Sequence, residues 1–245
     1  MLRIAPNSML QTLRRSVRRS SRCNQLFQFV LPLYRTLAVT DETQIVIEGF
    51  PRCANTFAVV AFNLAQPSIV RVAHHLHSVA QLRRGLELNI PTLVILRDPV
   101  DAILSLAIRN GHDDIRWACE EYVDFHDGAS SLGDRLVFAD FVEVTSDFGA
   151  VIRRLNRLTG SNFAVFEHTE ANVAKCFELA DQYEKRDAGG EAVRETHVSR
   201  PSAARQERKA ALAKQIESPE VRPIIDRAQR LYAELSRKRL AQAAE

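Results

Sequence analysis

Short apolar runs alternate with amphipathic segments between residues 44 and 160. The runs are about as long as buried strands, and the amphipathic segments repeat with helical spacing. Strands that alternate with helices predict an α/β fold in three layers, with a mostly parallel central sheet covered by helices on both faces. We expect strands at 44–48, 68–73, 92–96 and 135–138, and helices at 56–64, 79–88, 98–109, 114–125 and 146–158.

The helix at 98–109 has the clearest end signals. Asp98 is a suitable N-cap, Pro99 stands at the first helical position, and Asp101 lies in the first turn. Asn110 and Gly111 then end the helix.

The last third of the chain follows a different pattern. Residues 181–205 are polar and predict a long loop, whereas 205–216 and 218–244 predict helices. We expect residues 41–245 to form a single α/β domain with a helical C-terminal region. Residues 1–40 would form a separate arm.

This N-terminal arm has no acidic side chain, and it carries seven arginines. Leu10, Leu13 and Val17 share one helical face, with arginines largely opposite. A basic amphipathic helix of this kind binds anionic membrane surfaces or acts as a targeting segment. A solvated basic arm is the alternative.

Composition narrows the class of protein further. The net charge of +3 argues against a general nucleic-acid binder, so we expect no nucleic-acid partner. The four cysteines lie far apart, which favours a reducing compartment. No apolar run approaches the roughly 20 residues of a membrane span, and no signal peptide is evident. We expect a cytoplasmic protein, which is peripheral at a membrane if the arm binds one.

The first candidate site lies where the first predicted strand runs into its helix. Gly49 and Thr56 match the phosphate-loop pattern G-x-x-x-x-G-K-[ST]. Ala54 replaces the second glycine, and Asn55 replaces the lysine that holds nucleoside triphosphates. Arg52 places a permanent positive charge earlier in the loop. This pattern favours an oxyanion ligand and disfavours ATP chemistry. A generic strand–turn–helix with an exposed arginine is the alternative.

The second candidate site begins at Arg97, at the C-terminal end of a predicted strand, where open α/β sheets bind ligands. Ser105 follows about two helical turns later, so both side chains could reach a phosphate beside the helix. An ordinary capped helix with a surface arginine is the alternative.

Together the two segments resemble those of sulfotransferases that use 3′-phosphoadenosine 5′-phosphosulfate (PAPS). That family carries P-[KR]-[SC]-[GA]-[TNS]-T, which binds the 5′-phosphosulfate, and R-[DN]-P-x-D-x-x-x-S, which binds the 3′-phosphate. This chain reads PRCANT at 51–56 and RDPVDAILS at 97–105. The resemblance covers roughly residues 43–160 and implies the P-loop NTPase-like sulfotransferase fold. It implies that PAPS is bound by Pro51, Arg52, Cys53, Ala54, Asn55, Thr56, Arg97 and Ser105.

The resemblance adds three further positions. Phe57 stands where the family often places an aromatic residue against adenine, and Phe138 replaces a tyrosine near the base. Core packing is the alternative for both rings. Arg200 is the counterpart of a basic residue that closes the 3′-phosphate site.

The resemblance also implies in-line sulfuryl transfer to an acceptor hydroxyl, without a metal. Arg52 would stabilise the leaving phosphate. His75 matches the family's catalytic histidine, as the residue before Leu76, and His77 is the next candidate for the base. Glu48 and Glu87 are further candidates, because related carbohydrate-acting enzymes use a glutamate.

The acceptor cannot be read from the residues. A glycan, a glycolipid or a small molecule would each fit, and the basic arm favours a carbohydrate or lipid-linked acceptor at a membrane. Two other functions stay open. One is a nucleotide-type kinase of related fold, and the other is a non-catalytic, membrane-associated relative.

Overall fold

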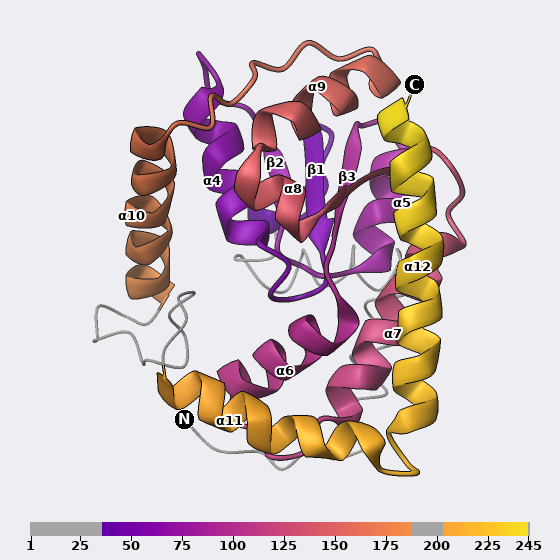
Figure 1. Cartoon of the computed structure of the whole chain (residues 1–245). Coiled ribbons are helices and arrows are strands. Elements are labelled where there is room, and N and C mark those ends of the chain that lie inside the picture. Colours follow the sequence, from indigo (N-terminus) through magenta and orange to yellow (C-terminus); the bar gives the residue numbers. More distant parts are fainter. Residues whose placement is uncertain (1–35, 188–202, 245) are drawn as a thin grey trace.

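The computed structural model describes residues 36–187 and 203–244, and these form an α/β protein in three layers (Figure 1). The sheet in this part of the chain has four parallel strands in the order β2-β1-β3-β4. The predicted architecture is therefore confirmed. The strands are β1 (Ile45–Gly49), β2 (Val72–His74), β3 (Thr92–Leu96) and β4 (Val137–Asp140).

Helices cover both faces of the sheet (Figure 1). The chain moves from β1 to β2 in one direction and then past β1 to β3 in the other, so right-handed crossovers put successive helices on opposite faces. One face carries α4 (Asn55–Ala65), α8 (Phe141–Ser146) and α9 (Phe148–Thr159). The other carries α5 (Val79–Glu87) and α7 (Arg116–Ser130), with α6 (Pro99–Asn110) leading into α7.

This strand order puts a topological switch point between β1 and β3. The two strands are adjacent, with Gly49 opposite Ile95 in the register. The chain leaves their carboxyl ends in opposite directions, which creates the crevice where open α/β sheets bind ligands. Both predicted phosphate segments start at this crevice.

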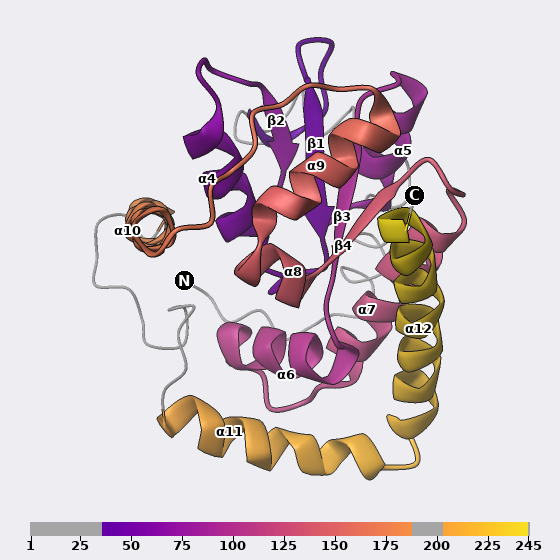
Figure 2. The ribbon, with the colours of Figure 1, turned by 45° about the horizontal axis from the view of Figure 1, so that its top comes forward.

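Three helices complete the described chain. They are α10 (Glu170–Asp187), α11 (Ala203–Ala213) and α12 (Arg222–Ala244), with a 3₁₀ turn η1 (Lys214–Glu217) after α11. Helix α10 packs on α4, and α11 packs on α6. Figures 1 and 2 both show α11 turning into α12, which rises past α7 and along the β4 side of the sheet.

The side chain of Gln242 on α12 pairs with the outer edge of β4. Its Nε2 donates to the carbonyl of Leu136 at 2.7 Å, and its Oε1 accepts the N–H of Phe138 at 2.9 Å. The amide group thus occupies hydrogen-bonding positions that a neighbouring strand would otherwise use.

Several predicted boundaries were wrong. The strand expected at 68–73 starts only at Val72, because the chain before it is a loop in which Ile69 is 99% exposed. The strand expected at 135–138 lies two residues later and ends at Asp140, whose side chain caps α8. Residues 181–187 belong to α10 instead of a loop. Most of the predicted arm lies in residues 1–35, outside the described part of the chain.

Candidate functional site

The loop after β1 has the backbone geometry of an anion-binding concavity. Arg52 and Ala54 both have left-handed φ values, 72° and 66°, and Cys53 between them does not. Alternation of this kind turns successive backbone N–H groups toward one side of the loop. Helix α4 starts directly afterwards, so the positive end of its dipole faces the same place.

Two contacts keep this loop close to the sheet. A Cβ atom on Gly49 would lie 2.6 Å from the carbonyl oxygen of Ile95, so only glycine allows the close approach of β1 and β3. Asn55 is buried, and its Nδ2 donates to the carbonyl of Phe50 at 3.0 Å. The residue in the lysine position therefore ties the loop together through its side chain.

Cys53 lies inside this loop with no exposed surface. Burial raises the pKa of its thiol to about 12, which keeps it protonated. A thiolate role at this position is therefore excluded near neutral pH.

The second predicted segment has the geometry that the sequence indicates. The side chain of Asp98 accepts the N–H of Asp101 at 3.0 Å, and Pro99 occupies the first turn of α6. Gly111 ends the helix with a φ of 68°. These signals fix where α6 starts, and they place Ser105 two turns along it.

The two segments contact each other directly. Arg52 donates its Nε–H to the Oγ of Ser105 at 3.1 Å. Arg97 donates from Nη1 to the carbonyl of Arg52 at 2.6 Å, and its guanidinium lies 4.1 Å from the centre of the Phe141 ring. Tyr122 donates to the carbonyl of Arg97 at 2.8 Å. Two guanidinium groups and a serine hydroxyl therefore meet at the switch point.

A turn of histidines follows β2 and faces the same loop. Nε2 of His75 lies 3.0 Å from Oγ1 of Thr56, and its Nδ1 lies 2.6 Å from Nδ1 of His74. His77 contacts the carbonyl of Gly49 through Nδ1 at 2.7 Å. The turn and the loop are thus joined at both ends of the loop.

Burial lowers the pKa of His75 to about 3, with smaller contributions from His77 and Arg109. Burial lowers the pKa of His74 to about 3 as well. Both rings are therefore neutral near pH 7, and the single proton between their Nδ1 atoms can belong to only one of them.

The remaining predicted residues have different surroundings. Phe57 is buried and packs against Phe166 and Phe177, and Phe138 is fully buried in the core. These contacts agree with the core-packing alternative, and contact with adenine stays a prediction for both. Arg200 lies outside the described residues. Pro51 lies partly exposed in the loop.

Four nearby residues were not among the residues predicted to bind PAPS. Phe141 and Tyr122 hold Arg97, and Lys209 of α11 forms an ion pair with Asp101 in the first turn of α6. Glu48 accepts the backbone N–H of Leu76 in the histidine turn. None of these four positions belongs to either of the two motif segments. Only the acidic residue inside an apolar strand gave a visible signal in the sequence.

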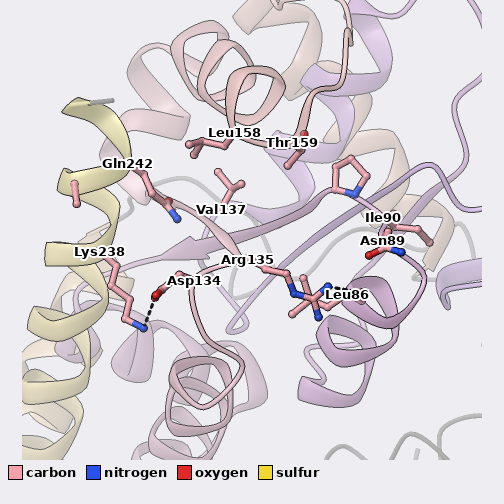
Figure 3. A pocket seen from close by; sticks show the side chains of 12 residues that line it. Leu86, Asn89, Ile90, Asp134, Arg135, Val137, Leu158, Thr159, Lys238 and Gln242 are labelled. Atoms are coloured by element: carbon pink, nitrogen blue, oxygen red, sulfur yellow. Dashed lines mark hydrogen bonds and ion pairs between the residues drawn. The ribbon is translucent and has the colours of Figure 1, made fainter.

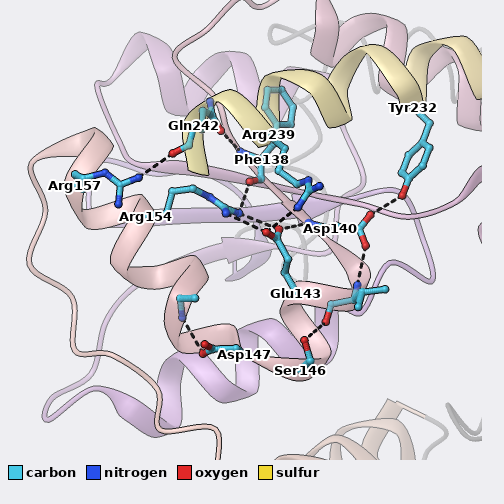
Figure 4. Close-up of polar contacts among 12 residues, drawn as sticks. Phe138, Asp140, Glu143, Ser146, Asp147, Arg154, Arg157, Tyr232, Arg239 and Gln242 are labelled. Atoms are coloured by element: carbon cyan, nitrogen blue, oxygen red, sulfur yellow. Dashed lines mark hydrogen bonds and ion pairs between the residues drawn. The ribbon is translucent and has the colours of Figure 1, made fainter. Parts of the chain in front are cut away.

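The carboxyl end of β4 is held by a polar cluster beside the crevice (Figure 4). Arg154 donates to the carbonyl of Phe138 at 2.8 Å and to Oε2 of Glu143 at 3.0 Å. Arg239 pairs with the same glutamate, and Tyr232 donates to Asp140 at 2.7 Å. This cluster anchors α8 and α12 to the end of β4, and so fixes the element that carries Phe141.

A surface pocket of about 620 Å³ lies at the amino ends of β3 and β4 (Figure 3). Pro91 before β3 and Val137 at the start of β4 line it, together with Arg135 and Lys238. Arg135 donates to the carbonyl of Leu86, and Lys238 pairs with Asp134. This pocket is separate from the crevice at the carboxyl ends of the strands.

Residues 36–187 and 203–244 contain no group of three or more His, Cys, Asp and Glu residues that could hold a metal ion. In the same part of the chain no helix is both long and apolar enough to cross a bilayer.

The fold and this arrangement define an α/β protein with a candidate anion site at its switch point. No protein-family model matches the chain, and a comparison with curated proteins gives no match either. Among solved structures, the chain is similar to mouse sulfotransferase SULT7A1 complexed with PAP, at 12% sequence identity. The match covers 77% of this chain and 90% of the mouse chain, with a TM-score of 0.42.

Proposed function

We propose that the protein is a sulfotransferase that transfers the sulfuryl group of PAPS to an acceptor hydroxyl. The observation that carries the proposal is the contact between Arg52 and Ser105, which joins the two motif segments at the switch point. The donors there suit an anion with two separate phosphate groups, because guanidinium groups and loop N–H groups come from two different elements.

Each side of the site has a proposed role. Arg97 and Ser105 bind the 3′-phosphate of PAPS. Arg52, Thr56 and the backbone N–H groups of residues 51–56 bind the 5′-phosphosulfate. Arg52 donates to a hydroxyl and Arg97 donates to a backbone carbonyl. A phosphate oxygen is a stronger acceptor for a guanidinium than either.

The reaction is an in-line displacement at sulfur. The acceptor oxygen forms a bond to sulfur and loses its proton to a base. The bond between sulfur and the phosphate oxygen breaks, and that oxygen keeps the electron pair as adenosine 3′,5′-bisphosphate leaves. Arg52 and the loop N–H groups stabilise the charge that develops on the leaving phosphate. No metal takes part in this proposal.

His77 is the proposed base, and His75 positions Thr56. Both ring nitrogens of His75 have partners inside the protein, Thr56 and His74. The low pKa of His75 also makes it a weak proton acceptor near pH 7. His77→Ala should abolish transfer while the affinity for adenosine 3′,5′-bisphosphate changes little. Full activity in that variant would return the role to His75. His112→Ala, at a partly exposed ring against Trp117, is the control.

The acceptor is proposed to be a carbohydrate or lipid-linked hydroxyl, reached from the cytoplasmic surface of a membrane. The acid-free basic arm supports this choice. Deletion of residues 1–35 spares the buried Ala38 and Val39. It should release the protein from vesicles that contain anionic lipid. Unchanged partition would remove the membrane from the proposal.

Two measurements test the function itself. Calorimetry should detect binding of adenosine 3′,5′-bisphosphate and none of Mg²⁺-ATP, and the reverse would favour a kinase. Radiolabelled sulfate from PAPS should be transferred to a component of a cell extract, whose chemistry then identifies the acceptor class. Binding of the bisphosphate without any transfer would favour a non-catalytic protein.

A further inference from the structure

A carboxylate lies buried in the central part of the sheet, directly before the loop of the candidate site. Glu48 has no exposed surface, and it follows three buried apolar residues in β1. A charged group in such a place is costly unless hydrogen-bond donors surround it. Because it has no exposed surface, Glu48 is also out of reach of an acceptor, which argues against its use as the base.

Three N–H groups from outside β1 are directed at this carboxylate, and two of them come from the histidine turn. Oε1 accepts the backbone N–H of Leu76 at 2.8 Å, and Oε2 accepts that of His77 at 3.0 Å. Gln81 on α5 donates from Nε2 to Oε1 at 2.8 Å. Burial raises the pKa of Glu48 to about 7, and these donors oppose the rise. Contacts with donors favour the ionised form of the carboxylate.

The histidine turn has a backbone that needs such support. His75 and His77 have φ values of 59° and 49°, which lie in the left-handed region that residues other than glycine rarely adopt. Residues of this kind persist where their surroundings hold them, and they gather at functional sites. The two backbone N–H groups on Glu48 lie at and directly before the second of these residues.

A contact with Gly49 determines which nitrogen of His77 carries a proton. The carbonyl of Gly49 can only accept, so Nδ1 of His77, 2.7 Å away, must be the donor. In the neutral ring Nε2 is then the nitrogen that can take a proton. Oε2 of Glu48 lies 3.7 Å from Nδ1, and a negative charge there stabilises the imidazolium that forms after proton uptake.

We propose that Glu48 is a positioning residue, which holds the 75–77 turn in its left-handed form and fixes His77 as the Nδ1–H tautomer. Its effect on catalysis rests on the proposed sulfuryl transfer, with His77 as base. The tautomer and the turn do not depend on that reaction, so the two ideas can fail separately. The titratable groups that face His77 include Glu48 on β1 and His75 in the same turn, and α5 contributes the neutral Gln81 to the Glu48 carboxylate.

The test uses the full chain with isotope-labelled histidine rings, whose tautomers NMR distinguishes. The His77 signals are assigned by their loss in His77→Gln. Glu48→Gln keeps the size of the side chain, but it turns an NH₂ group toward at least one of the three donors. We expect the His77 ring to become a mixture of both tautomers in this variant. We also expect kcat to fall roughly ten- to a hundredfold, with KM for PAPS nearly unchanged.

Gln81→Met gives a second test in case Glu48→Gln does not fold. It removes one donor from Oε1 and leaves the carboxylate in place, so a smaller change in the same direction is expected. Gln66→Met is the matched control. Gln66 also ties two distant segments, through Phe62 and Ala164, but it lies away from the histidine turn. This control should leave the tautomer and kcat unchanged.

Each outcome decides between the two ideas. A pure Nδ1–H tautomer that persists in Glu48→Gln overturns the positioning role, whatever the activity. If Glu48→Gln is unfolded, the same result in Gln81→Met overturns it. If the tautomers respond but the unsubstituted protein transfers no sulfate from PAPS, the positioning role stands and the proposed reaction fails.

Discussion

Arg52 and Ser105 lie 53 positions apart in the chain, and Nε of the arginine donates to Oγ of the serine at 3.1 Å. One residue belongs to the loop after β1 and the other to the second turn of α6. The contact brings together a guanidinium group and a hydroxyl that the sequence motifs assign to different phosphate groups of one ligand. The contributions of the two residues to the binding free energy of such a ligand should therefore depend on each other.

The first prediction concerns that coupling. Arg52→Ala and Ser105→Ala should each weaken binding of adenosine 3′,5′-bisphosphate in calorimetry. Their effects should also be non-additive, by roughly 0.5–3 kcal/mol, because the residues are in contact. Arg52→Ala combined with Ser131→Ala is the control pair, since the exposed Ser131 bonds Gly128 away from the site. Additive effects in the first pair would contradict a shared binding site.

The second prediction concerns Arg97. A hydrogen bond to a charged group contributes about 1.5–3 kcal/mol, so Arg97→Ala should lower the affinity for the bisphosphate roughly ten- to a hundredfold. Arg135→Ala is the matched control. This variant removes a guanidinium that also donates to a backbone carbonyl, that of Leu86. Arg135 lies at the amino end of β4, away from the candidate site. Equal affinities for the two variants would remove Arg97 from the site.

The third prediction concerns the strained start of α4. Ala54 has a φ of 66°, and a Cβ atom in this region costs about 1–2 kcal/mol. Ala54→Gly should therefore raise the free energy of unfolding by about 0.5–1 kcal/mol, after the larger entropy of glycine in the unfolded chain is subtracted. Ala210→Gly, at an exposed position inside α11, should lower it by about 1 kcal/mol. Denaturant titration measures both, and a loss of stability in Ala54→Gly would contradict the loop geometry.

The fourth prediction concerns pH. His126 is fully buried against Tyr122, and burial lowers its pKa to about 4. As the pH falls from 6.5 to 4, the unfolded chain takes up a proton that the folded protein does not, so this group destabilises the fold. The His126→Phe variant should therefore gain roughly 3 kcal/mol on the unsubstituted protein between pH 7 and pH 4.

His112→Phe supplies the matched substitution for this pH series, at a ring that is partly exposed and lies against Trp117. Chemical denaturation at several pH values gives the free energies of unfolding. A difference between His126→Phe and the unsubstituted protein that stays constant from pH 7 to pH 4 would contradict the buried, neutral state of His126.

The architecture could be predicted because it depends on local patterns. The alternation of apolar runs with amphipathic segments predicted the parallel sheet. The signals at Asp98, Pro99 and Gly111 predicted the ends of α6 to within one residue. Short edge elements were less predictable. Strand β2 has only three residues, and its position depends on pairing with β1, which no local pattern encodes.

The site was predictable only where its residues belong to the two motifs. The sequence indicated Arg52, Arg97 and Ser105, and the structure brings them together. It could not indicate that Arg97 donates to the backbone of Arg52, or that Phe141 packs against its guanidinium. The first contact depends on how β1 and β3 end side by side, and the second depends on how β3 and β4 do. The role of Glu48 likewise depends on a turn that comes 28 positions later.

The amide of Gln242 has a consequence for the behaviour of the protein in concentrated solution. It pairs with both Leu136 and Phe138 on the outer edge of β4, where exposed N–H and C=O groups would otherwise recruit strands from other molecules. One side chain in the last turn of α12 thus covers part of this edge, which should disfavour pairing with strands of other molecules. We therefore expect the resistance of the protein to aggregation to depend on the docking of α12 as well as on the sheet itself.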